Sequence, residues 1–270
     1  MVKKEILFGI NPVYEALKAG RRDIFKVFIT KEKISKRLEG IITLADSLKI
    51  PVEESNSLYL KSISGSEHHQ GVGVQTGPYP FVKVSEMLGS FQGGKSNPFL
   101  LLLDNIMDPR NLGALIRTAL CVGVNGVIIP KDRSAQPIPT VSKASAGALE
   151  HICLSRVTNM VNTIKMLKKR GLWIAGMDKI STESIFTYDM KQFNAIVIGG
   201  EGKGVRPLVK KHCDMLLSIP QTGPLDSLNA SAAGAVVMYE AFRQRQLSDR
   251  WKLEREKRKE DKGNHPARLA

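Results

Sequence analysis

Cysteine is scarce in this chain and is not arranged for metal or disulfide chemistry. The 270 residues contain only Cys121, Cys153 and Cys213, which lie far apart and form no Cys-x-x-Cys pair. Neither a zinc knuckle nor a disulfide framework is indicated, and a reducing, cytoplasmic location fits. His68 and His69 are adjacent but have no further histidine or cysteine close by, so we expect a turn there and no metal cofactor.

Long hydrophobic runs and nucleotide-binding glycine patterns are also missing. No apolar stretch reaches the length of a membrane span, and the short apolar run near the N-terminus is interrupted by Gly9 and Pro12. We therefore expect neither export nor a membrane partner. No Gly-x-x-x-x-Gly-Lys-Ser/Thr occurs, and no Gly-x-Gly-x-x-Gly opens a helix after the first strand, which disfavours ATP and NAD.

Basic residues are in clear excess. Forty Lys and Arg stand against 26 Asp and Glu, which gives a net charge of +14. Such an excess points to a polyanionic partner such as nucleic acid. The pair Arg21 and Arg22 and the basic group within 31–37 could contact phosphates, although a solvated helix face is the commoner reason for such runs.

Composition divides the chain into a small unit, a linker, a larger unit and a tail. Residues 1–77 read as a small α/β unit, with helices at 11–17 and 34–48 and strands at 25–29 and 72–74. Residues 78–98 are rich in proline and glycine and are expected to form a linker. Residues 99–247 form the second unit, and the charged residues 248–270 read as a flexible tail.

The second unit reads as an α/β domain with a mostly parallel sheet. The apolar run 99–103 suits a strand buried on both faces of such a sheet. Strands and helices then alternate at short spacing. We expect strands at 126–129, 172–176, 195–198 and 215–219, and helices at 112–122 and 158–169.

Three segments of this unit carry polar residues that could act chemically. The first, 111–119, places Asn111 and Arg117 in an otherwise apolar helix. The second, 198–207, has glycine at four of the six positions from 199 to 204, with Glu201 among them. The third, 219–231, brings the polar residues Asp226, Ser227 and Asn229 to the start of the last apolar helix.

All three segments follow predicted parallel strands, whose carboxyl ends bind ligands in open α/β sheets, so together they predict one pocket. Two plainer readings stay open. Arg117 could form an internal salt bridge with Asp104 or Asp108, and the last helix could be an ordinary capped, buried helix.

These three segments, in this order, resemble the motifs of the SpoU/TrmH family of RNA 2'-O-ribose methyltransferases in the SPOUT superfamily. The resemblance extends to 8–13, 69–71 and 130–134, and so over most of the chain. It is strongest to the type that modifies a guanosine of 23S ribosomal RNA. It implies an α/β SPOUT-type parallel sheet with a C-terminal trefoil knot, preceded by a small L30e-like α/β domain that binds the RNA substrate.

The resemblance also implies a cofactor, an assembly and a site. S-adenosylmethionine would be the methyl donor, and the protein would be a homodimer with the last helix and the helix of the first motif at the interface. The cofactor-binding positions fall on Gly199, Gly200, Ile219 and Leu228. The catalytic positions fall on Asn111, Arg117, Glu201, Ser227 and Asn229. Arg110 stands where this type often has histidine.

The expected reaction transfers a methyl group to a ribose 2'-hydroxyl of 23S ribosomal RNA. Arg117 is a poor candidate for a literal base, because the pKa of an arginine side chain lies far above 7 and deprotonating it at pH 7 costs about 9 kcal/mol. We expect it to stabilise the developing alkoxide as a cation. Transfer to tRNA, and a non-catalytic role in ribosome assembly, are the alternatives.

Overall fold

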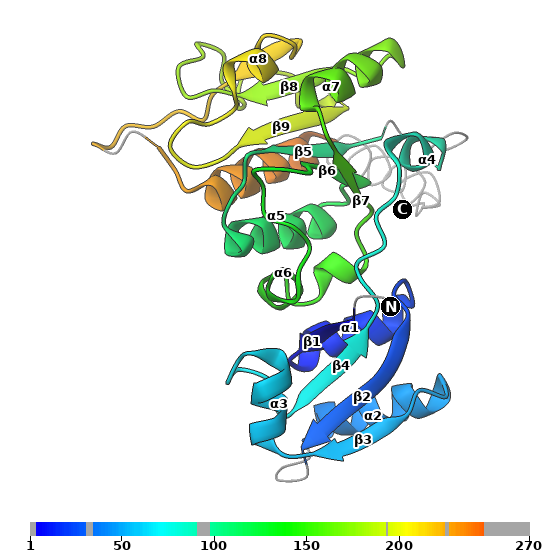
Figure 1. The fold of residues 1–270 in the computed structure, drawn as a ribbon. Coiled ribbons are helices and arrows are strands. Elements are labelled where there is room, and N and C mark those ends of the chain that lie inside the picture. The colour runs from blue at the N-terminus through cyan, green and yellow to red at the C-terminus, as the bar shows by residue number, and fades with distance from the viewer. Residues whose placement is uncertain (1–3, 31–34, 91–97, 193, 225–226, 246–270) are drawn as a thin grey trace, which may run out of the picture.

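Two α/β units stacked end to end make up the computed structural model, which describes residues 4–30, 35–90, 98–192, 194–224 and 227–245 (Figure 1). The predicted tail 248–270 and the polar residue Asp226 lie outside these ranges. Among the described residues, no helix is long and apolar enough to cross a membrane.

The small unit is a four-stranded mixed sheet with helices on both faces. Its strand order is β1 (Glu5–Phe8), β4 (Val72–Thr76), β2 (Ile24–Thr30) and β3 (Val52–Ser55). The helices α1 (Ile10–Ala19) and α2 (Lys36–Ser47) pack on one face, over a core that includes Val72 and Val74. The intervening Gly73 faces the other side and leaves room for Leu60 of α3 (Ser57–Ser64).

The larger unit is a six-stranded sheet in which every strand pair is parallel. The strand order is β10 (Met215–Leu217), β8 (Ile174–Met177), β9 (Ala195–Gly199), β5 (Leu100–Asp104), β6 (Gly126–Pro130) and β7 (Leu154–Val157). The parallel α/β architecture predicted from the sequence is confirmed. The C-terminal knot implied by the resemblance stays a prediction.

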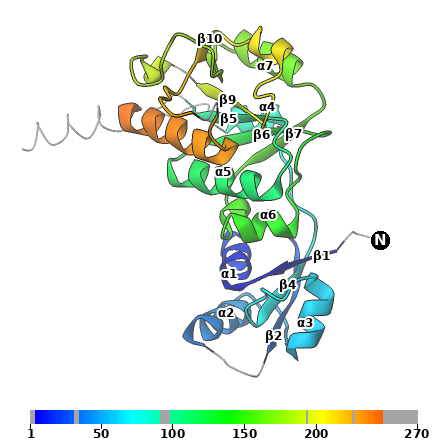
Figure 2. The ribbon, with the colours of Figure 1, turned by 90° about the vertical axis from the view of Figure 1, so that its left-hand side faces the viewer.

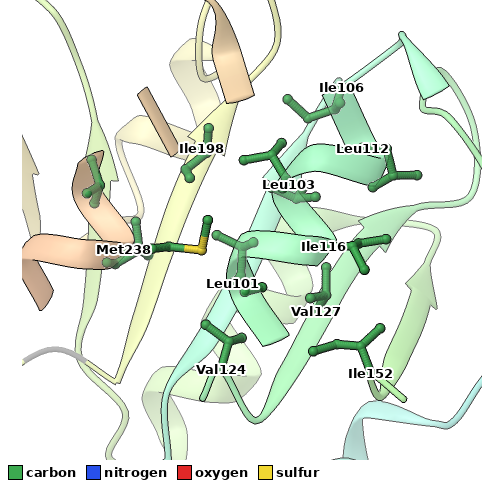
Figure 3. Close-up of a cluster of buried hydrophobic side chains, with 14 of the residues drawn as sticks. Leu101, Leu103, Ile106, Leu112, Ile116, Val124, Val127, Ile152, Ile198 and Met238 are labelled. Atoms are coloured by element: carbon green, nitrogen blue, oxygen red, sulfur yellow. The ribbon is translucent and has the colours of Figure 1, made fainter. Parts of the chain in front are cut away.

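Helices cover both faces of this sheet, which explains the unbroken apolar strands. Leu101 and Leu103 face a core formed with α5 (Pro109–Cys121) and the C-terminal helix, residues 230–245 (Figure 3). Leu100 and Leu102 face a second core, on the side of α7 (Met160–Lys169) and α8 (Pro207–Lys210). Figure 2 shows α5 beside the C-terminal helix on one side and α7 on the other.

The segment 78–98 is not a free linker over its described part. It carries α4 (Val84–Gly89), and Met87 and Leu88 are buried in the second core, with Met87 against Gly126. Tyr79 is also buried. The apolar side chains that alternate with the prolines gain burial on the sheet, and this outweighs the proline and glycine content on which the prediction rested. Residues 91–97 lie outside the described ranges.

Several short elements were not predicted. They include β1, β3, α3, β7 and α6 (Pro139–Ala144), together with the short 3-10 helix η1 (Ala148–Glu150). Each has eight residues or fewer, so none offers enough periodicity to be recognised. Two of them, α6 and η1, lie between the larger sheet and the small unit (Figure 1).

Candidate active site

A pocket of about 510 Å³ opens at the carboxyl ends of β8 and β9 and beside the chain that follows β10. This volume lies within the range of small-molecule sites. The pocket brings together residues that are far apart in the sequence. Of the predicted site residues, it is lined by Gly199, Gly200, Glu201, Ile219, Ser227, Leu228 and Asn229.

The glycines after β9 serve the backbone fold itself. A Cβ atom on Gly199 would lie 2.0 Å from the carbonyl carbon of Gly204, and one on Gly200 would lie 2.0 Å from the carbonyl oxygen of Asn105. No side chain fits such spaces. Gly202 has φ 78° and Gly204 has φ 62°, a conformation that glycine adopts without strain. We expected these glycines to let a ligand approach the backbone. In the structure, the space beside Gly199 and Gly200 is filled by other backbone atoms of the chain.

A buried ion pair anchors the end of this loop. Asp104 is fully buried at the end of β5, and its carboxylate accepts hydrogen bonds from the Arg206 guanidinium, Nη2 at 2.6 Å and Nε at 2.9 Å, and from the Arg206 backbone N–H at 2.9 Å. Asp108 instead caps α5 by accepting from the backbone N–H of Arg110 at 2.8 Å. The internal salt bridge considered for Arg117 is therefore not formed with either aspartate in this structure.

One carboxylate oxygen joins the three predicted segments. Oε1 of Glu201 accepts hydrogen bonds from Nδ2 of Asn111 and from Nδ2 of Asn229, the latter at 2.9 Å. Asn229 also caps the C-terminal helix, because its Oδ1 accepts from the backbone N–H of Ser231 at 2.9 Å. The cap fixes the amide so that its N–H group points toward Glu201. The predicted convergence is thus seen at atomic contact for these three residues.

Arg117 lies apart from this cluster within one chain. It is six residues beyond Asn111 on α5, so it lies about 9 Å along the axis and about 240° around it. Its side chain is exposed, and no hydrogen bond or ion pair to it is found within the described ranges. It is absent from the pocket wall. The sequence pattern placed Arg117 in the site, but a single copy of the chain does not bring it there.

The sequence did not point to the residues at the end of β8 and just beyond it. Met177, the last residue of β8, lines the pocket together with Asp178 and Ile180. Asp178 is nearly buried and forms an ion pair with Lys210, with Nζ and Oδ2 2.9 Å apart. The predicted strand 172–176 could have indicated these residues, because parallel sheets bind ligands just beyond the carboxyl ends of their strands.

A parallel α/β domain with a pocket at its strand ends, preceded by a small α/β unit, defines the class of this protein. Profiles of two families match the chain: the SpoU rRNA Methylase family over residues 98–239, and the RNA 2'-O ribose methyltransferase substrate binding family over residues 6–82. The chain belongs to the SpoU rRNA methylase family.

Named relatives span nearly the whole chain. It is 38% identical over 244 residues to the 23S rRNA (guanosine-2'-O-)-methyltransferase RlmB of Escherichia coli, covering 89% of this chain and 99% of that protein. It is 37% identical over 241 residues to the putative TrmH family tRNA/rRNA methyltransferase YacO of Bacillus subtilis, covering 89% and 96%. In fold it is similar to the SpoU methyltransferase AviRb of Streptomyces viridochromogenes, with TM-score 0.76, 22% identity and 90% of both chains covered.

Proposed function

We propose that this protein transfers a methyl group from S-adenosylmethionine to the ribose 2'-hydroxyl of a guanosine in 23S ribosomal RNA, in the cytoplasm. The observation that carries the proposal is the meeting of Asn111, Glu201 and Asn229 at the wall of one pocket. The identity to an RNA 2'-O-methyltransferase over most of the chain supports the substrate. The net charge of +14 suits an RNA partner.

The pocket suits the proposed cofactor in size and lining. Ile219 and Leu228 offer apolar contacts, and Gly199 and Gly200 line the pocket beside them. When bound, S-adenosylmethionine supplies a methyl group made electrophilic by its positive sulfur. The chain itself has to hold the ribose hydroxyl in line with that methyl group and to stabilise the charge that develops on the oxygen.

Glu201 and its two asparagines form the proposed orienting group. The Glu201 side chain is exposed to the pocket, and both of its hydrogen-bond donors, from Asn111 and Asn229, are neutral amides. The carboxylate therefore keeps its charge available to a cation. Arg117 is the cation we assign, with a fork of N–H groups for an alkoxide or a phosphate. Ser227, also at the pocket wall, is assigned a supporting hydrogen bond to substrate.

The position of Arg117 makes a homodimer part of the proposal. Arg117 and the partly exposed Leu120 lie on α5, and Tyr239 is half exposed on the neighbouring C-terminal helix. We infer that these two helices meet their counterparts in a second copy and that Arg117 completes the partner's pocket. The small residues of the C-terminal helix are partly used within the chain, because a Cβ atom on Gly234 would lie 2.2 Å from Leu115.

Labelled S-adenosylmethionine tests the reaction directly. Purified protein is incubated with transcribed 23S ribosomal RNA or with total tRNA, and the alkali-resistant dinucleotide is mapped, because a 2'-O-methyl group blocks alkaline cleavage. We expect the label in one alkali-resistant dinucleotide of 23S RNA whose methylated residue is a guanosine. Label in tRNA alone would make the tRNA enzyme the correct reading, and no transfer to either RNA would favour an assembly factor.

Mixing two inactive variants tests the shared site. If Arg117 acts across the dimer, an Arg117→Ala chain paired with a Glu201→Ala chain rebuilds one intact site. Random exchange should then restore about a quarter of the parent activity, because about half of the dimers are mixed and each has one good site. No recovery after verified subunit exchange would place Arg117 and Glu201 in the same chain's site or outside it.

A further inference from the structure

The pair Arg21 and Arg22 does not lie free for phosphate. The Arg22 side chain is 1% exposed and its guanidinium is surrounded by acceptors. It donates to Oε2 of Glu150 at 2.7 Å, to Oε2 of Glu5 at 2.8 Å and to the carbonyl oxygen of Gly77 at 3.3 Å. Arg21 donates to the carbonyl oxygen of Ile152. Phosphate contact was one reading of this pair, and the fold uses both arginines internally instead.

Glu150 brings the opposite charge from the other unit. It belongs to η1 of the larger unit, and its side chain is 1% exposed. Its Oε1 accepts from Oγ of Ser142 at 2.8 Å and from Nη2 of Arg22 at 3.3 Å. Both carboxylate oxygens are therefore satisfied. The result is a closed, buried ion pair that crosses from the small unit to the larger one.

Two further contacts flank this ion pair. Nε2 of His151 lies 2.7 Å from Oε2 of Glu15 on α1. On α6, Nζ of Lys143 donates to Oε1 of Gln70 at 2.8 Å, and burial lowers the pKa of this lysine. We call these three contacts, Arg22–Glu150, Glu15–His151 and Gln70–Lys143, the domain junction. Contacts at three separate points resist rotation of one unit on the other, which a single contact would not.

A buried ion pair selects one arrangement more than it adds stability. Removing an arginine and a glutamate from water is costly, and their mutual pairing compensates for it together with the hydrogen bonds to Glu5, Gly77 and Ser142. A rotation that separated the two units while keeping this region away from water would leave Glu150 buried without its cation, whereas Arg22 would keep its pair with Glu5. The junction therefore favours a single orientation of the small unit over the alternatives.

We propose that the domain junction holds the two units as one rigid body and that Arg22 and Glu150 are positioning residues for the RNA substrate. The proposal rests on the proposed function for the identity of the substrate. RNA held by the small unit then meets the pocket at one fixed offset, which raises the effective concentration of the target ribose there. Loosening the junction weakens productive RNA binding and leaves cofactor binding and the chemical step intact.

Kinetics of a junction variant test this role. Glu150→Gln keeps the shape of the side chain and removes its charge. We expect the KM for 23S RNA to rise about tenfold or more, with kcat within about twofold and the affinity for S-adenosylmethionine unchanged. Lys26→Gln is the matched control, because Lys26 and Glu53 form an exposed ion pair within the small unit alone. That control should leave all three quantities as in the parent.

A covalent bridge at another point of the junction should rescue the variant. Glu15→Cys and His151→Cys are joined by a short bismaleimide in a Cys121→Ser background, Cys121 being exposed. The bridge should return the KM of Glu150→Gln to the value of the bridged parent, which a merely structural defect would not allow. An unchanged KM in Glu150→Gln, or loss of methyl transfer in the bridged parent, would overturn the proposal.

A measurement without turnover separates this inference from the proposed function. Spin labels at the exposed Glu39 and Lys165 positions, one on each unit, report the distance between the units when labelled chains are diluted with unlabelled ones. We expect one narrow distance distribution in the parent and a broad one in Glu150→Gln. A broad distance distribution in the parent would contradict the proposal that the junction holds the two units rigidly, whether or not the protein methylates RNA.

Discussion

Two glutamates of the larger unit are held in opposite ways. Glu201 is exposed at the pocket wall and takes its hydrogen bonds from the neutral amides of Asn111 and Asn229. Glu150 is 1% exposed and is enclosed by the Arg22 guanidinium and the Ser142 hydroxyl. The two side chains are chemically identical, and they differ only in the groups that surround them.

The difference teaches how to separate an acting carboxylate from a supporting one. A carboxylate already neutralised by a buried cation has no charge left to offer a ligand, but it resists displacement. A carboxylate oriented by neutral donors beside a pocket keeps its charge free and is fixed in direction. We therefore assign the exposed Glu201 to the proposed chemistry and the enclosed Glu150 to the proposed placement of the small unit.

Removal of the open carboxylate should give the largest effect on turnover. We expect Glu201→Ala to lower kcat at least about a hundredfold while the melting temperature stays close to that of the parent, because the side chain is exposed. Glu150→Gln should instead keep kcat close to that of the parent and raise the KM for RNA. Single-turnover methyl transfer at saturating RNA and cofactor measures both. If Glu201→Ala were as fast as the parent, the proposed role of Glu201 in methyl transfer would be wrong.

A methyl group added in the pocket loop should cost stability. Gly200→Ala places a Cβ atom 2.0 Å from the Asn105 carbonyl oxygen, so the loop has to shift. We expect a loss of about 3 kcal/mol in the free energy of unfolding and loss of cofactor binding, as for overpacked sites. Urea denaturation and calorimetric titration with S-adenosylmethionine measure the two effects.

Gly40→Ala is the control for that change. Gly40 lies within α2, and an added Cβ atom meets nothing within 4 Å. This substitution should stabilise the chain by about 0.5–1 kcal/mol, because alanine favours the helix. Equal effects of the two substitutions would mean that the tight backbone contact at Gly200 does not constrain the loop.

The free energy of unfolding should fall at high pH through Tyr79, whose ring lies 5.3 Å from the Arg22 guanidinium of the domain junction. Burial raises the pKa of Tyr79 from 10.0 to about 12. The folded state thus disfavours the ionised phenol, and the stability due to this group is present below pH 10 and falls as the pH rises toward 12. Between pH 9 and pH 11, the parent should lose about 1 kcal/mol more than Tyr79→Phe.

Chemical denaturation of both proteins at the two pH values measures this smaller effect. The difference between the parent and Tyr79→Phe removes the contributions of other groups that titrate in the same range. Parallel losses in the two proteins would show that Tyr79 ionises equally easily in the folded and unfolded chains.

Much of the site was predictable because its signals are local. Asn111, Glu201 and Asn229 each follow a parallel strand, and the carboxyl ends of such strands share one edge of the sheet. Their meeting in one pocket follows from that rule, whereas only the structure shows that both asparagines donate to one oxygen of Glu201. The end of β8 and the segment after it obey the same rule and were missed, since Met177, Asp178 and Ile180 carry no motif.

The unpredicted features depend on partners that are distant in the sequence. No residue near Arg22 in the sequence indicates that it pairs with Glu150, which lies 128 residues away. The proline and glycine content of 78–98 indicated a linker, but Tyr79, Met87 and Leu88 find apolar surface on the larger unit. A pattern of residue types reports what a segment prefers alone and not which surface it will meet.

By itself, the sequence determined the parallel α/β architecture, because runs such as 99–103 are apolar at every position and must be buried on both faces. It also determined the family, through motifs in a fixed order. Only the tertiary structure decided which charges are spent on internal pairing, as with Arg22 and Asp104, and which are left open, as with Glu201. Burial and pairing depend on groups brought close by folding, and a linear sequence does not state these distances.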